Sequence, residues 1–210
     1  MKKYDLYLFD FDGTLLDTLP SLDYVFKTSY ESIGVRWDSS LTEEFSRIPL
    51  NVGYEKLGAS KQHWEVFCKT IDESLDHQKT IELSKCYPET KKFVQYLKDH
   101  NLKAGIVTSN NKKHVIEVLK VLDIDPNVFE VIIGNKECQR FKPYPDPILI
   151  GLEAFNYKGD KRKVVYVGDG NNDMLSAISA GVDAVLIDRE NNAPFNKDYK
   201  IIHKLTDLFE

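Results

Sequence analysis

The 210-residue sequence predicts an α/β protein: a parallel sheet with helices on both faces and an all-helical segment inserted after the first strand. Two observations support this fold class. From residue 87 onward, short apolar runs alternate with helix-like segments, which is typical of right-handed crossovers between parallel strands. Between residues 18 and 84 no strand pattern occurs.

The first strand is predicted in the apolar run Leu6–Phe9, which ends at Asp10 and Asp12. A continuous apolar run is typical of a buried strand in a parallel sheet. Because side chains alternate along a strand, Asp10 and Asp12 can face the same side where this strand ends. Two carboxylates there are costly without a cation, a shared proton or water, although Asp12-Gly13 is also a common turn pair.

The inserted segment, residues 18–84, is expected to form its own domain, and residues 1–17 with 85–210 the other. Its first helix should begin after a cap at Asp17 or Thr18 and end before Gly34. Further helices are predicted near residues 41–47, near 52–57 and after residue 60. Their aromatic stripes are interpreted as core.

The remaining strands are predicted at residues 102–110, 128–133, 164–169 and 184–187, the last of these being the final strand. Helices separate them, and a further helix is expected near the C-terminus. Asp146-Pro147 is a good helix start, and Gly181 ends a helix that opens at Asn171 or Asn172.

Polar side chains follow three of these strands. Because ligands of open α/β sheets bind at the carboxyl ends of the strands, we expect the side chains to share one site. A lysine in a loop adds a cation, and an acid at a helix start can either cap that helix or support a metal. These residues are Asp10, Asp12, Thr108, Ser109 and Asp169 at the strand ends, Lys142 in the loop and Asp173 at the helix start.

These residue types indicate phosphoryl transfer. Asp10 and Asp169, with Asp173 as a third candidate, offer the oxygen ligands that suit Mg²⁺. A carboxylate can accept a phosphoryl group, and Mg²⁺ with Lys142 would supply the counter-charge. Asp12 can protonate the leaving oxygen and then deprotonate the attacking water, while the Thr108 hydroxyl can hold phosphate oxygens.

The sequence resembles the haloacid dehalogenase superfamily of phosphohydrolases. Four stretches look like its four motifs, in the family's order and over nearly the whole chain: Asp10–Asp17, Val107–Asn110, Lys142–Pro147 and Gly168–Asp173. The helical insert is similar to the small cap of the phosphoglycolate phosphatase-like branch, which closes over the site and selects the substrate.

The resemblance implies a Rossmann-like core and a Mg²⁺-dependent phosphatase that hydrolyses a small phosphomonoester through an aspartyl-phosphate. Asp10 would be the nucleophile and Asp12 the general acid/base. Mg²⁺ would be bound by the Asp10 carboxylate, the Asp12 backbone carbonyl and Asp169, with support from Asp173. The phosphate contacts would be Thr108, Ser109 and Lys142.

Other functions fit parts of the pattern. Asp12 argues against dehalogenases and phosphonatases, whereas a β-phosphoglucomutase-like phosphotransferase stays open, although such enzymes usually carry an acid where Gly168 stands. A dinucleotide-binding oxidoreductase is another alternative, because Gly168–Asp173 imitates a dinucleotide-binding turn, but Asp173 replaces the third glycine of that turn. A non-enzymatic phospho-receiver switch would leave the helical insert and Asp12 unexplained.

Arg47 is the residue of the insert that is a candidate for substrate selection. This arginine can meet a second anionic group of the substrate, or it can be an ordinary solvated residue at a helix end. The sequence does not decide between these two interpretations, and it indicates neither the particular phosphorylated metabolite nor the oligomeric state.

The composition limits the partners and the cellular location that can be expected. The net charge of −5 and the isoelectric point near 5.6 argue against nucleic acid as a main partner. No apolar run approaches membrane-spanning length, so no membrane association is expected. Three widely separated cysteines indicate reduced thiols and a cytoplasmic location.

Overall fold

The structure, a computed structural model, describes residues 4–75, 77–193, 196 and 198–209. The chain divides into two compact units. Met1–Asp17 and Cys86–Glu210 form the first, here named the sheet unit, and Thr18–Lys85 form the second, the helical unit. Among the described residues, no helix is long and apolar enough to cross a bilayer.

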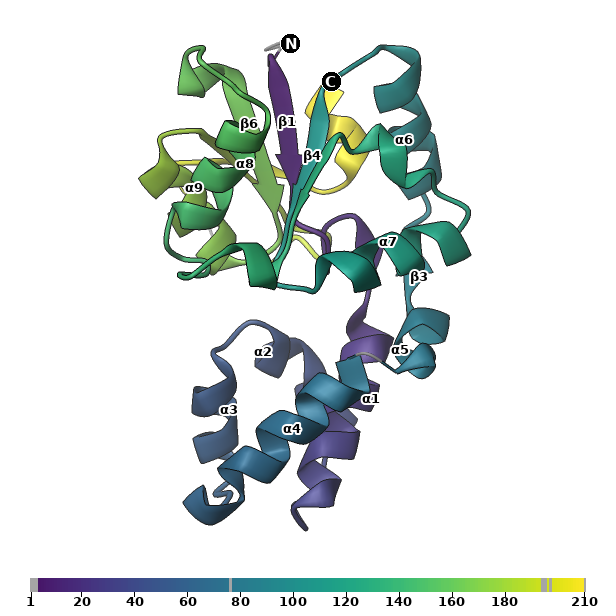
Figure 1. The fold of residues 1–210 in the computed structure, drawn as a ribbon, viewed down its shortest axis with the longest axis vertical. Coiled ribbons are helices and arrows are strands. Elements are labelled where there is room, and N and C mark those ends of the chain that lie inside the picture. The colour runs from purple at the N-terminus through teal and green to yellow at the C-terminus, as the bar shows by residue number, and fades with distance from the viewer. Residues whose placement is uncertain (1–3, 76, 194–195, 197, 210) are drawn as a thin grey trace. The chain divides into compact units, whose positions relative to one another are not determined.

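The sheet unit is built on a six-stranded parallel sheet with the strand order β5-β4-β1-β6-β7-β8, as the alternating pattern predicts. Its interior strand β1 pairs with β4 on one side and β6 on the other (Figure 1). The strands are β1 (Leu6–Phe9), β4 (Ala104–Val107), β5 (Val131–Ile133), β6 (Val164–Gly168), β7 (Asp183–Ile187) and β8 (Lys200–Ile202).

Helices cover both faces of this sheet. Leu6 and Leu8 of β1 belong to a buried cluster with residues of α8 (Asp146–Ala154) and α9 (Asn171–Ala180). Phe9 points to the opposite face, where its ring packs edge-on against Phe93 of α6 (Thr90–Asp99) at 5.4 Å between centroids. The alternation along β1 therefore places apolar side chains on both faces, as expected for a strand covered on each side.

The remaining elements are short or connect the strands, and one of them, β3, crosses from Lys85 of the helical unit to Cys86 of the sheet unit. Helix α7 follows β4, and β2 forms a separate two-stranded sheet with β3. The bounds are α6 (Thr90–Asp99), α7 (Lys112–Val121), β2 (Leu16–Asp17), β3 (Lys85–Cys86) and the 3-10 helices Pro126–Val128, Asn135–Glu137, Lys161–Lys163 and Leu205–Phe209.

The C-terminal part differs from the sequence-based expectation. A sixth strand, β8, lies parallel to β7, with Ile201 opposite Leu186, and the expected terminal helix is the short 3-10 helix Leu205–Phe209. The apolar stretch of β8 is only two residues long, Ile201 and Ile202. Such a short run carries no period from which a strand can be recognised.

The helical unit has an aromatic core, as its stripes indicated. Tyr30 stacks on Trp37 with centroids 5.2 Å apart, and Phe67 lies 4.8 Å from Tyr30. The elements of this unit are α1 (Leu19–Ser32), α2 (Thr42–Ser46), α3 (Leu50–Lys56), α4 (Trp64–Leu75), α5 (Gln78–Leu83) and the 3-10 helices Ser39–Leu41 and Lys61–His63.

The first helix of this unit lacks the predicted side-chain cap. Thr18 occupies the N-cap position, but its side chain accepts no hydrogen bond from the first turn. Its backbone angles, φ −109° and ψ 4°, differ from the extended conformation that lets an N-cap hydroxyl reach that turn. Pro20, in the first turn, remains a sufficient start signal because its φ is preset for a helix.

Asp23 of α1 holds the following segment in place. Its carboxylate accepts hydrogen bonds from Trp37 Nε1 at 2.8 Å, Ser39 Oγ at 3.0 Å and Thr42 Oγ1 at 2.7 Å. Burial raises the pKa of Asp23, but the hydrogen bonds from Thr42, Trp37 and Ser39 together hold this pKa below its ordinary value.

We expect Asp23→Ala to lower the free energy of unfolding of the helical unit by about 1–3 kcal/mol, because three donors lose their acceptor. The folded-state pKa of Asp23 is depressed, so its contribution is complete above the unfolded value of about 3.9 and is lost as the pH falls through the folded value. The gap between variant and wild type should therefore close below about pH 4.

Urea unfolding followed by tryptophan fluorescence measures this effect, because both tryptophans, Trp37 and Trp64, lie in the helical unit. Asp72→Ala, at an exposed position of α4, is the matched control. Equal losses in Asp23→Ala and Asp72→Ala would show that the hydrogen bonds of Asp23 do not stabilise this unit.

Candidate active site

Three strands of the sheet unit end at polar residues on the same edge. Phe9 of β1 lies opposite Ile106 of β4 and Val167 of β6, so the residues that follow these strands emerge together. The predicted site residues that come directly from these strand ends are Asp10, Thr108 and Asp169.

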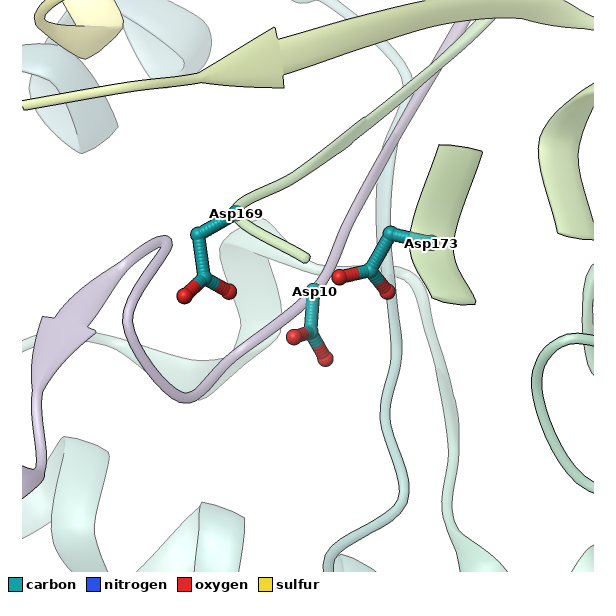
Figure 2. Close-up of side chains that lie close together, drawn as sticks. All are labelled: Asp10, Asp169 and Asp173. Atoms are coloured by element: carbon teal, nitrogen blue, oxygen red, sulfur yellow. The ribbon is translucent and has the colours of Figure 1, made fainter. Parts of the chain in front are cut away.

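Three carboxylates converge at this edge. Oxygen atoms of Asp10, Asp169 and Asp173 all lie within 4.8 Å of one another. Figure 2 shows that they come from three separate segments: the end of β1, the end of β6 and the start of α9. Asp10 and Asp173 are buried, whereas Asp169 is partly exposed.

Lys142 supplies positive charge to this group. Its Nζ lies 2.8 Å from Asp10 Oδ1 and 2.6 Å from Asp173 Oδ1, and its side chain is only 8% exposed. Burial would lower the pKa of Lys142, but Asp10 and Asp173 raise that pKa well above its ordinary value. The lysine therefore remains a buried ammonium that bridges two acids.

The acids nevertheless outnumber the ammonium. Burial raises the pKa of Asp10; Lys142 opposes this change, while Asp173 and Asp169 reinforce it. Because a further cation would favour the ionised carboxylate, the charge balance of this cluster suits a divalent ion. Carboxylate oxygens are also the donors that Mg²⁺ prefers.

The donors do not contribute equally to such a metal site. Asp173 Oδ1 accepts from Lys142 and from the Tyr166 hydroxyl, and Asp173 Oδ2 accepts from the Gly170 backbone N–H at 3.0 Å. Asp173 thus caps the N-terminus of α9 and also forms the ion pair with Lys142. Asp10 and Asp169 are the carboxylates better placed for direct contact with an ion, with Asp173 in support.

Asp12 has a side-chain partner from the next strand end. The Asn110 amide donates to Asp12 Oδ2 at 3.3 Å, while Asn110 Oδ1 accepts from the Asn111 backbone N–H at 2.7 Å. The second contact fixes which end of the Asn110 amide faces Asp12. The half-buried Asp12 is therefore held by a neutral donor.

The two hydroxyls after β4 differ in their surroundings. Thr108 is buried, and its Oγ1 accepts from the Asn110 backbone N–H at 3.0 Å, which caps a turn. It is not the cap of α7, a position that Asn111 takes by accepting from Lys113 N. Ser109 is exposed at the same turn.

A tight loop after Asp12 lies against Asp169. A Cβ at Gly13, where φ is +73°, would come within 2.4 Å of Asp169 Oδ2, so this position requires glycine for both space and conformation. Thr14 Oγ1 donates to Asp169 Oδ1 at 3.4 Å. The loop therefore contacts Asp169 through two successive residues.

Sequence reasoning assigned no role to Thr14, Asn110 or Tyr166. Tyr166 OH lies 2.9 Å from the Val107 carbonyl and 3.1 Å from Asp173, and it accepts from Lys142 at 3.3 Å. Burial raises the pKa of Tyr166, so the phenol stays a neutral donor. The sequence offered one signal for a role of Tyr166, which is that a polar hydroxyl stands in an apolar strand two residues before Gly168.

Arg47 belongs to the helical unit. Directly after α2 it forms an ion pair with Glu43 at 2.8 Å, and both side chains are about half exposed. An exposed arginine with an ion pair at a helix end is compatible with both interpretations that the sequence left open.

Comparisons with known proteins show the family to which the sequence is related. Residues 7–187 match the family model of the haloacid dehalogenase-like hydrolases. A PpaX protein of Caldanaerobacter subterraneus is 30% identical over 186 residues, covering 88% of this chain and 82% of the relative. The phosphoglycolate phosphatase of Haemophilus influenzae is 26% identical, with coverages of 87% and 85%.

Solved structures share the fold. The haloacid dehalogenase-like family hydrolase SP0104 of Streptococcus pneumoniae superposes with a TM-score of 0.83 at 21% identity, covering 100% of this chain and 98% of its own.

We expect Lys142→Met to lower the free energy of unfolding by about 3–5 kcal/mol, because it leaves two buried carboxylates without their ammonium. The loss should shrink as the pH falls and the carboxylates take up protons. Urea unfolding followed by far-ultraviolet circular dichroism measures it. Lys113→Met, where the lysine side chain is 83% exposed, is the control; similar losses in both variants would contradict the stabilising role of Lys142.

Proposed function

We propose a specific reaction for this chain, which belongs to the haloacid dehalogenase-like hydrolases and is a phosphatase. It hydrolyses a small phosphomonoester, requires Mg²⁺ and forms an aspartyl-phosphate intermediate. The observation that carries the proposal is the setting of Asp10. This buried carboxylate touches Lys142 and shares one cluster with Asp169 and Asp173.

In the first step, an Asp10 oxygen forms a bond to phosphorus while the bond from phosphorus to the leaving oxygen breaks. Lys142 holds the Asp10 carboxylate in place and offsets the negative charge that gathers around the phosphate. Mg²⁺, bound by the carboxylates of Asp10 and Asp169 and the backbone carbonyl of Asp12, would neutralise phosphate oxygens.

Asp12 is proposed to move the protons. It gives a proton to the leaving oxygen, and as a carboxylate it then takes one from the water that hydrolyses the intermediate. The hydrogen bond from Asn110 keeps this carboxylate oriented through both steps. Thr108 and Ser109, at the end of the neighbouring strand, are proposed to contact the phosphate oxygens.

We expect Asp10→Asn to abolish phosphate release, by at least about 10³-fold, because an amide cannot accept the phosphoryl group. Asp12→Asn should slow both steps by about 10²–10⁴-fold, the usual contribution of a general acid/base. Release of inorganic phosphate and rapid-quench detection of phosphorylated protein measure the two effects. Wild-type turnover in either folded variant would refute the corresponding role.

The substrate is proposed to carry a second anionic group. Two relatives are named pyrophosphatase and phosphoglycolate phosphatase, and both names denote a small molecule with a second acidic group beside the phosphate. We propose that the helical unit acts as a cap that selects this group, with Arg47 as its contact. The relatives' names favour transfer of the phosphoryl group to water, which is hydrolysis, over its transfer to a sugar, which a mutase would carry out. A cytoplasmic location is proposed for the reaction.

A panel of phosphorylated metabolites, including phosphoglycolate and pyrophosphate, should yield inorganic phosphate only when Mg²⁺ is present. For the best substrate we expect Arg47→Ala to raise KM about 10-fold with kcat unchanged, a loss of about 1.4 kcal/mol of binding energy. Arg36→Ala, at another exposed position of the helical unit, is the control. An unchanged KM in Arg47→Ala would identify Arg47 as an ordinary helix-end residue.

A further inference from the structure

The loop that lies against Asp169 is held from its outer side by two donors that are distant in sequence. Arg189 Nη2 donates to the Thr14 carbonyl at 2.9 Å, and Thr90 Oγ1 donates to the Leu15 carbonyl at 2.8 Å. Two consecutive carbonyls of the loop are thereby fixed. Arg189 follows β7, and Thr90 is the first residue of α6.

The guanidinium of Arg189 is itself fixed on two further sides. Its Nη1 forms an ion pair with Glu89 Oε1 at 2.5 Å, and its Cζ lies 3.4 Å from the centre of the Tyr87 ring. The side chains of Arg189 and Glu89 are only 18% and 14% exposed. Glu89 also accepts from the Leu205 backbone N–H at 3.3 Å. A cation so enclosed keeps one position and is not a solvated surface charge.

Thr14 connects this cation to the acid cluster. Its carbonyl accepts from Arg189, while its hydroxyl donates to Asp169 Oδ1 at 3.4 Å. The neighbouring Gly13 also approaches Asp169 so closely that no side chain would fit between them. A displacement of the loop would therefore change both contacts that it makes with the Asp169 carboxylate.

We propose that Arg189 is a positioning residue for Asp169. By holding the Thr14 carbonyl, it keeps the loop of residues 13–16 against this carboxylate and so sets the orientation in which Asp169 meets a divalent cation. The inference rests on the proposed function, because it takes Asp169 as a metal ligand. Arginine suits this place since its planar fork donates in two directions while its face stacks on an aromatic ring, which a lysine cannot do.

The test compares Mg²⁺ binding by the full-length wild type, Arg189→Met and Arg189→Lys, measured by isothermal titration calorimetry without substrate. We expect Arg189→Met to weaken Mg²⁺ binding about 10- to 100-fold, the usual effect of losing a group that orients a metal ligand. Arg189→Lys should fall between Arg189→Met and wild type. In phosphatase assays, the Mg²⁺ concentration for half-maximal rate should rise in parallel, with KM at saturating Mg²⁺ near the wild-type value.

Arg162→Met is the matched control, because Arg162 pairs with Asp160 on the surface and its side chain is 80% exposed. A purely structural role would lower the melting temperature of the Arg189 variants and leave their Mg²⁺ affinity unchanged, which would overturn the inference. Should Arg189→Met fail to fold, Arg189→Lys decides by the same measurement.

The outcome for Arg189 is separable from that of the proposed function. A wild type that binds Mg²⁺ but releases no phosphate from any substrate would end the proposed function, while the calorimetric comparison would still support or refute the role of Arg189. A wild type that binds no Mg²⁺ would overturn the inference together with the metal site.

Discussion

The ammonium of Lys142, buried between Asp10 and Asp173, is the interaction on which the site depends. A parallel sheet delivers the ends of its strands to one edge, and in this chain two of those ends, after β1 and β6, carry acids. Buried acids that lie close together repel one another and lose hydration, so they need a cation at short range. The lysine meets that need in part, and the remaining carboxylates suit a second cation.

A supporting layer of hydrogen bonds stands behind the side chains that face the reaction. Asp173 is held by the Tyr166 phenol and the Gly170 backbone N–H, and Asp169 is contacted by Thr14. Partners of this kind decide how accurately reacting groups are oriented. The arrangement explains why a neutral phenol, kept protonated by burial, is found inside an otherwise apolar strand.

Much of this architecture could be predicted because its signals are local. An apolar run that ends in Asp10 or Asp169 marks both a strand and its polar end, and parallel topology then places these ends together. The strand β8 was missed because its two apolar residues carry no period. The contact of Arg189 with Thr14 joins positions 175 residues apart, and no spacing rule connects them. The roles assigned to individual side chains stay predictions until the variants are measured.

The helical unit interrupts the sheet unit at one point, leaving after Asp17 and returning at Cys86. The contacts described above for the acid cluster and its supporting layer join residues of the sheet unit. The sixty-eight residues from Thr18 to Lys85 thus form a separable segment, and exchanging them would leave the described contacts of the sheet unit in place. A different segment inserted at this junction, by evolution or by design, could direct the same reaction to other substrates.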